Sequence, residues 1–155
     1  MIAGAAVLVV VSGVIAGIVL TGRGTPIRQK SVASIHFDVN SVDCGSENII
    51  TGEARLKAPA EFCIADISTR SVGVSAAALD LTCQYLITTS GTRLPPDGQG
   101  TFILNGSQAP KGKLEVRNEP QSVMLAFDAP HGTEPKALEL HASCNSPGVT
   151  IRGSR

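Results

Sequence analysis

The chain has 155 residues, with 13 Lys and Arg against 13 Asp and Glu, so its formal net charge is zero. Aromatic residues make up 3% of the chain, and Trp is absent. Because nucleic-acid binding relies on a basic face and, for single strands, on stacking aromatic rings, we expect no nucleic-acid partner.

The first 20 residues carry no charged side chain, and Ser12 is their one polar residue. About 20 apolar residues span the hydrocarbon core of a bilayer. The segment lacks the basic start, short apolar core and small-residue cleavage site of a removable secretory signal. We predict an uncleaved transmembrane helix over residues 1–20, acting as a signal-anchor for a single-pass membrane protein. A tether over residues 21–31, rich in glycine and basic residues, follows it.

The orientation of this segment rests on two opposing signals. Arg23, Arg28 and Lys30 follow it, and no basic side chain precedes it. The positive-inside rule alone would place the remainder of the chain in the cytoplasm. Paired cysteines would place it in an oxidising compartment instead. We give the cysteines more weight and expect the folded domain on the extracytoplasmic face of the cell membrane.

Small residues in the segment predict a packing face. Gly13 and Gly17 form a GxxxG pattern, with Ser12 and Ala16 beside them. Such spacing lets two membrane helices approach closely. Ordinary glycine content of a span would give the same pattern, so helix packing through these four residues is a hypothesis.

Short strands follow the tether. Alternating apolar residues predict strands at residues 35–39, 84–89, 123–127, 138–140 and 149–151, and an apolar run predicts another at residues 62–67. Residues 72–81 fit either a strand or one helical turn. Ser90-Gly91 predicts a hairpin turn into residues 92–94. Residues 95–98 are expected as a loop, and residues 101–104 as a short strand closed by Asn105-Gly106.

Seven to eight short strands with regular turn signals predict an all-β fold. The architecture that fits is an immunoglobulin-like antiparallel β-sandwich over residues 32–155. The Trp that packs on the disulfide of antibody domains is absent, so we expect a sandwich without that core.

Four cysteines, Cys44, Cys63, Cys83 and Cys144, lie in this part of the chain. Four buried thiols would be the expectation for a cytosolic protein. An even number of cysteines in a small β domain behind a membrane segment favours two disulfides. Four cysteines allow three pairings, and spacing alone does not select one.

Several motifs resemble a family of small exported actinobacterial immunoglobulin-like domains of unknown function, which is similar to a small secreted mycobacterial immunoprotective antigen. Some members of that family carry a telomeric-repeat-binding label. The motifs are Phe37-x-Val39, Val42-x-Cys44-Gly45, Glu61-Phe62-Cys63-Ile64, Phe127-Asp128-x-Pro130-x-Gly132-Thr133-x-Pro135, Leu138-Glu139-Leu140-His141-x-Ser143 and Gly148-Val149. The resemblance implies a β-sandwich, export, no catalytic residues and a Cys44–Cys63 disulfide, which leaves Cys83 and Cys144 for a second one.

Motifs for catalysis or cofactor binding are missing. The sequence contains no GxSxG elbow, no phosphate-binding loop and no dinucleotide fingerprint. The three histidines do not stand in metal-ligand spacing. Asp128, His131 and Glu134 would be conceivable ligands, but a polar turn explains them as well. We therefore expect no enzyme activity, no metal site and no cofactor.

Two functions remain open. The first is a non-catalytic accessory subunit, or protein-binding domain, of a larger membrane complex. The second is an envelope protein that binds a small ligand, lipid or glycan in a groove of the sandwich. An extracytoplasmic hydrolase is a third alternative with no motif in its favour.

Overall fold

The computed structural model describes residues 29–32 and 34–152. The predicted transmembrane helix, with its packing residues Ser12, Gly13, Ala16 and Gly17, and residues 21–28 of the predicted tether lie outside them. Within the described ranges, no helix has the length and apolar character needed to cross a bilayer.

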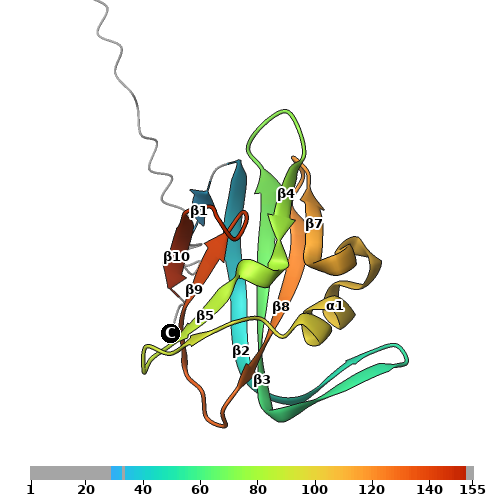
Figure 1. Ribbon diagram of the computed structural model, residues 1–155, viewed down its shortest axis with the longest axis vertical. Helices are drawn as coiled ribbons and strands as arrows, with labels where there is room; N and C mark the ends of the chain where they lie inside the picture. The colour runs from blue at the N-terminus through green and yellow to red at the C-terminus, as the bar shows by residue number, and fades with distance from the viewer. Residues whose placement is uncertain (1–28, 33, 153–155) are drawn as a thin grey trace, which may run out of the picture.

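The described residues form an all-β sandwich of antiparallel strands (Figure 1). One sheet has the strand order β1 (Gln29–Val32), β2 (Ile35–Thr51), β3 (Ala54–Ser71) and β8 (Gln121–Ala129). The other has the order β10 (Gly148–Arg152), β9 (Pro135–His141), β5 (Tyr85–Thr88) and β6 (Arg93–Leu94). A separate two-stranded ribbon pairs β4 (Ala77–Asp80) with β7 (Lys113–Val116). The predicted all-β sandwich is confirmed at this level.

The core lies between the two sheets and follows the period-two pattern of the sequence. Ile35 and Phe37 of β2 are fully buried, and their neighbour His36 is not. The apolar face of β8 (Val123, Leu125 and Phe127) meets Leu138 and Leu140 of β9 in the same cluster. Burying each large apolar side chain stabilises the fold by about 1.5–3 kcal/mol, so these alternating residues set which face of each strand points inward.

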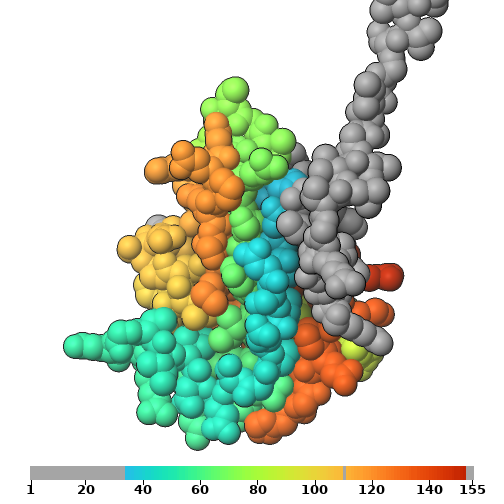
Figure 2. All heavy atoms as spheres, turned by 180° about the vertical axis from the view of Figure 1, so that it is seen from behind, coloured from blue at the N-terminus to red at the C-terminus, as the bar shows by residue number. Residues whose placement is uncertain are grey.

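Two of the predicted short strands are parts of a much longer hairpin. β2 has 17 residues and β3 has 18, joined by a tight turn at Gly52 and Glu53. The register slips between the pairs Ser46–Phe62 and Asn48–Lys57, where β3 supplies extra residues that include Pro59. The hairpin bends there, and residues 48–57, which we call the hairpin arm, turn away from the sheet (Figures 1 and 2, teal).

The sheet also begins earlier than the sequence predicts. β1 pairs with β2 from Gln29 to Val32, so it includes the last three residues of the segment expected as a tether. Residues 72–81, for which a strand and a helical turn were both open, contain β4 and the start of a 3-10 turn, η1 (Leu81–Cys83). Strand β7 was not predicted.

The strand predicted at residues 101–104 is wrong, because these residues belong to the helix α1 (Gly98–Asn105). The Asp97 side chain caps the start of α1 by accepting the Gly100 N–H, and Gly106, with φ of 57°, follows its last turn. An aspartate at the N-cap and a glycine after the last turn are the usual helix boundaries. These two signals outweigh the strand preference of Phe102 and Ile103. Two further 3-10 turns, η2 (Gly106–Gln108) and η3 (Pro110–Gly112), lead on to β7.

Helix α1 covers the outer face of the first sheet. Ile103 and Leu104 pack against a second apolar cluster, which consists of Ile49, Ala58, Phe62 and Ala126. Gly100 allows the close approach, because a Cβ at this position would lie 2.8 Å from Ile49 Cδ1 and 2.9 Å from Ala126 Cβ. The helix therefore buries the base of the hairpin arm and the middle of β8.

Side chains of α1 also close the free edge of β8. The Asn105 amide donates to the Met124 carbonyl (2.6 Å) and accepts from the Met124 N–H (3.0 Å), as a paired strand residue would. One helical turn earlier, Thr101 Oγ1 accepts the Ala126 N–H (3.1 Å). Unpaired strand edges invite pairing with other chains, so α1 protects this edge of the sheet.

Candidate functional site

Two loops meet at one end of the sandwich and form a cleft. They are the β5–β6 loop (residues 89–92) and the β8–β9 loop (residues 130–134), at the lower end of Figure 1. Gly91 and Gly132, with φ of 87° and 74°, allow the two tight turns. The Thr89 N–H donates to the Glu134 carbonyl (3.0 Å), which ties one loop to the other. The predicted Ser90-Gly91 hairpin turn is confirmed, since Leu86 pairs with Leu94 across it.

The cleft has a volume of about 240 Å³ and is lined by both hydroxyl-bearing and apolar residues. Five of its lining residues carry one: Thr88, Thr89, Ser90, Thr92 and Thr133. Leu94 and Pro130 add apolar surface. No Lys or Arg belongs to the lining, and the ionisable groups there are His131 and Glu134, both exposed.

Three of the hydroxyls form a chain along the β5–β6 loop. Thr88 Oγ1 lies 2.7 Å from Ser90 Oγ, which lies 3.1 Å from Thr92 Oγ1. Thr88 Oγ1 also accepts the Thr92 N–H (3.0 Å). On the opposite loop, the Thr133 hydroxyl donates to the Pro130 carbonyl (2.7 Å). Hydrogen bonds within the loops therefore hold four of the five hydroxyl groups in place.

A buried carboxylate fixes the β8–β9 loop from behind. Glu61 of β3 is 6% exposed, and its carboxylate accepts the N–H groups of Gly132 and Thr133, both at 3.2 Å. His131 Nδ1 lies 3.5 Å from the same carboxylate, while the His131 side chain remains 72% exposed. Within the described part of the chain, no hydroxyl lies within hydrogen-bonding distance of the His131 ring.

The residues considered as metal ligands do not come together. His131 and Glu134 border the cleft, whereas Asp128 lies on β8 and is exposed. Partial loss of water around its carboxyl group, with a smaller effect of the Asp97 charge, raises the pKa of Asp128. Across residues 29–32 and 34–152, the one group of three closely spaced potential ligands is Asp80, Cys83 and Cys144. The two sulfur atoms of this group are bonded to each other, so they are not available as thiolate ligands.

Both predicted disulfides are present. Cys44 is bonded to Cys63 and joins β2 to β3 within the long hairpin. Cys83 is bonded to Cys144 and joins η1 to the β9–β10 loop. No free cysteine remains in the described residues. The pairing agrees with the one that the family resemblance implies.

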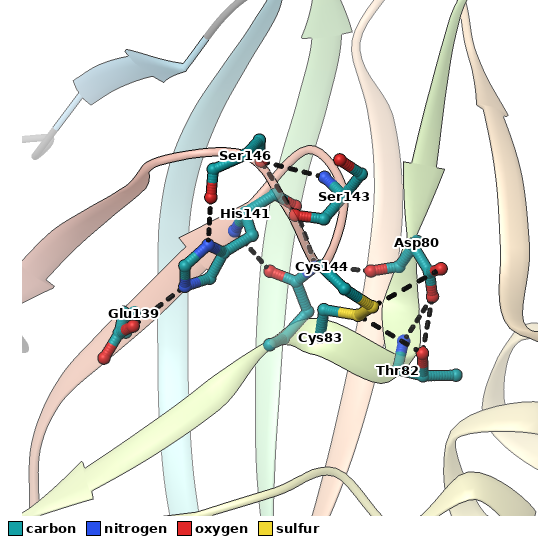
Figure 3. Close-up of a disulfide and its surroundings, with 9 residues drawn as sticks. Asp80, Thr82, Cys83, Glu139, His141, Ser143, Cys144 and Ser146 are labelled. Carbon is teal, nitrogen blue, oxygen red and sulfur yellow. Dashed lines mark hydrogen bonds and ion pairs between the residues drawn. A yellow bond between two sulfur atoms is a disulfide. The ribbon is translucent and has the colours of Figure 1, made fainter.

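Figure 3 shows the surroundings of the Cys83–Cys144 disulfide, where His141 supports the β9–β10 loop. His141 Nδ1 lies 2.9 Å from the Ser146 carbonyl oxygen, and Nε2 lies 2.8 Å from a Glu139 carboxylate oxygen. Both partners are acceptors, so the two contacts are complete when both ring nitrogens carry protons. Gly148 makes room for the ring, because a Cβ there would lie 2.5 Å from His141 Cε1.

Arg93 extends this network across the outer face of the second sheet. Its Nε and Nη2 donate to the two Glu139 oxygens at 3.1 and 2.7 Å, and its guanidinium lies 3.3 Å from the centre of the Tyr85 ring. The hydrogen bond from Arg93, assisted by the one from His141, lowers the pKa of Glu139 against the opposing effect of burial. The network spans β5, β6 and β9 and stabilises the sheet that leads to the cleft.

The cleft and the network were not predicted from the sequence. The run Thr88-Thr89-Ser90 was interpreted only as a strand followed by a turn. Its partner residues follow more than 40 positions later, at residues 130–134, and only the antiparallel pairing of β5 with β9 brings them together. A local signal existed in the number of hydroxyl residues around Gly91.

Comparison with known proteins supports the fold and assigns no family. No family model matches the chain, and no curated protein matches it. The yjhA protein of Bacillus subtilis is similar in structure, with a TM-score of 0.56 and 17% identity over 80% of this chain and 94% of that one. The ycdA protein of Bacillus subtilis has a TM-score of 0.50 and 12% identity over 83% of this chain and 39% of that one.

A third similar structure is MPT63, a secreted protein of Mycobacterium tuberculosis. It has a TM-score of 0.46 and 11% identity over 73% of this chain and 79% of that one. The two Bacillus proteins have higher TM-scores and indicate a shared fold. This chain therefore shares the overall β fold of the yjhA and ycdA proteins.

Proposed function

We propose that this chain is a non-catalytic binding module of the extracytoplasmic face, tethered to the membrane by residues 1–20 and folded as an immunoglobulin-like sandwich. Its ligand occupies the cleft between the β5–β6 and β8–β9 loops. The observation that carries this proposal is that both loops are held rigidly, by the Thr89–Glu134 backbone hydrogen bond and by the buried Glu61 carboxylate. A preformed cleft loses little conformational entropy when a ligand binds.

The two disulfides support the proposed location. Disulfides persist in oxidising compartments and are rare in a reducing cytoplasm. Alkaline extraction of membranes from cells that produce the full chain tests the tether, and protease treatment of intact cells tests the side. We expect the protein in the membrane pellet and its domain accessible from outside. Release by alkali, or protection from protease in intact cells, would contradict this part of the proposal.

The cleft can be tested with a defined fragment library of four classes: neutral sugars, amino acids, dicarboxylates and nucleosides. We expect ligand-observed NMR to detect binders to the wild-type chain that are lost in Thr92→Trp, which fills the cleft. Ser107→Trp is the matched control, since Ser107 is exposed and lies outside the cleft. If no class binds, or if the same fragments bind both variants equally, the cleft is not the binding site.

A second candidate function is an accessory subunit of a membrane complex. It is favoured by the β3–β4 loop, at the end of the sandwich opposite the cleft (Figure 1, top). Val72 and Val74 in this loop are 62% and 102% exposed. Exposed apolar residues mark contact sites when they gather in one place. Purification of the full chain in detergent, with Val72→Ser/Val74→Ser as the comparison, tests it. A defined partner that is lost in the double variant would support it, and a monomer in both cases would exclude it.

A further inference from the structure

We infer that the loop-end cleft binds one ring of a neutral saccharide. This inference rests on the proposed function, because it names the class of ligand for the same cleft. It follows from the hydrogen-bonding capacity that the fixed hydroxyls leave unused, from the charge of the lining and from the size of the space.

The hydroxyl chain has capacity left for both a donor and an acceptor. Thr88, Ser90 and Thr92 together bring three O–H protons, and the two contacts between them use two. One O–H of the three therefore remains to be donated outward, and lone pairs remain to accept. A sugar hydroxyl is itself both donor and acceptor, so it can satisfy both kinds of vacant position at once.

The hydroxyls at the other side of the cleft differ in what they offer. The Thr133 hydroxyl already donates to Pro130, so its oxygen is left as an acceptor. The Thr89 side chain makes no hydrogen bond to another described residue, so its hydroxyl can act as donor or acceptor. The cleft thus presents polar groups from both loops, spaced around a central volume.

The charge of the lining argues against anionic ligands. Glu134 borders the cleft and the Glu61 carboxylate lies directly behind the β8–β9 loop, while no Lys or Arg lines the space. A phosphate or carboxylate would lose its hydration in the cleft and find no Lys or Arg to pair with. The basic side chain in the lining is His131, which is exposed. A neutral ligand avoids this cost.

The size of the cleft argues against a lipid. Its volume of about 240 Å³ lies just below the range of about 300–1,000 Å³ that is usual for sites of drug-sized ligands. Leu94 and Pro130 provide apolar surface for the carbon face of one ring, but not a tunnel for an acyl chain. One sugar unit, either free or at the end of a glycan, fits this space.

The test is a titration of the full chain, in detergent, followed by its amide NMR signals. The probes are glucose, galactose and N-acetylglucosamine, with glucuronate and glucose 6-phosphate as charged counterparts. We expect at least one neutral sugar to shift signals of residues 88–94 and 130–134, and the charged sugars to bind more weakly. Ser90→Ala breaks the hydroxyl chain and should weaken binding by about 2- to 12-fold, the equivalent of one net hydrogen bond.

Two further variants keep the test decisive. Thr89→Val removes a hydroxyl that no described residue uses, so it should weaken binding without disturbing the loop. Ser107→Ala, outside the cleft, should leave binding unchanged. If neutral sugars shift no cleft signals while another class of fragment binds there, the saccharide inference fails and the binding module stands. If nothing binds in the cleft, both fail.

Discussion

The two sheets of the sandwich differ in what covers their outer faces. The first sheet is packed on both sides, because α1 and the base of the hairpin arm bury a second apolar cluster on its outer face. Among the residues that the structure describes, the second sheet has an apolar cluster on its inner face, and its outer face carries the polar network of Tyr85, Arg93, Glu139 and His141. The first sheet is therefore stabilised by a second apolar cluster, whereas the outer face of the second sheet is stabilised by polar contacts.

The two disulfides also differ in place, because one lies within the first sheet and the other joins η1 to the β9–β10 loop. Cys44 and Cys63 lie on adjacent strands that are already hydrogen-bonded to each other, and Cys63 is fully buried. Cys83 is buried but Cys144 is exposed, and their bond ties a loop to the body of the domain. Removing one bridge at a time shows how much the fold depends on a bond within a sheet and on a bond that holds a loop.

The largest expected effect is the loss of a disulfide. The sequence separations of 19 and 61 residues correspond, in the chain-entropy treatment, to about 3 kcal/mol for Cys44–Cys63 and about 4 kcal/mol for Cys83–Cys144. We expect Cys83→Ala/Cys144→Ala to lower the free energy of unfolding more than Cys44→Ala/Cys63→Ala, as measured by urea denaturation. The opposite order would mean that the packing of Cys63 in the core outweighs the chain entropy.

The next largest effect should come from the helix that covers the first sheet. Gly100→Ala places a Cβ against Ile49 and Ala126, and such overpacking costs about 1–3 kcal/mol. Gly98→Ala in the same helix is the matched control, because a Cβ there meets no atom within 4 Å. That change should stabilise the domain by up to about 1 kcal/mol, since alanine favours the helix. Thermal denaturation of both variants measures the difference, and equal effects would show that α1 does not need its close contact.

The sequence predicts the elements that face the core better than the elements that other parts of the fold cover. The strands that line the core follow from alternation, as in Val123, Leu125 and Phe127, and the Ser90-Gly91 turn follows from its glycine. The long hairpin was missed because residues 43–48 of β2 are mostly polar and make no apolar alternation. Helix α1 was missed because the strand preference of Phe102 and Ile103 conceals the caps at Asp97 and Gly106. Apolar alternation thus identifies the strands that face the core. It fails for segments whose burial depends on contacts with a neighbouring element.

The cleft and the polar network could not be predicted from local sequence patterns, and the reason is a different one. The Glu61 carboxylate contacts Gly132 and Thr133 from more than 70 positions away, and no property of Glu61 in the sequence indicates these partners. Arg93 and Glu139 are 46 positions apart and meet only because β6 and β9 flank β5. Charged residues on strands predict exposure, but the pairing between them depends on the register of the sheet.

The smallest expected effect concerns the network on the second sheet and its dependence on pH. Arg93 is 46% exposed and Glu139 is 25% exposed, so their ion pair should contribute at most about 1 kcal/mol. Because the folded state holds the pKa of Glu139 below its ordinary value of about 4.3, this contribution is complete above that value. It is lost as acid protonates Glu139 through its lowered folded pKa.

Arg93→Gln removes the largest cause of that shift. We expect the variant to be less stable than the wild type at neutral pH, and the difference to narrow once the pH lies below the folded pKa of Glu139, as measured by urea midpoints across this range. The contact of Arg93 with the Tyr85 ring accounts for any difference that remains. Arg117→Gln is the control, because the Arg117–Glu115 pair is similarly short, at 3.1 Å, but is 71% and 65% exposed. If both variants lose the same stability at neutral pH, the Arg93 pair is an ordinary surface ion pair. In that case the outer face of the second sheet does not stabilise the strands that hold the cleft.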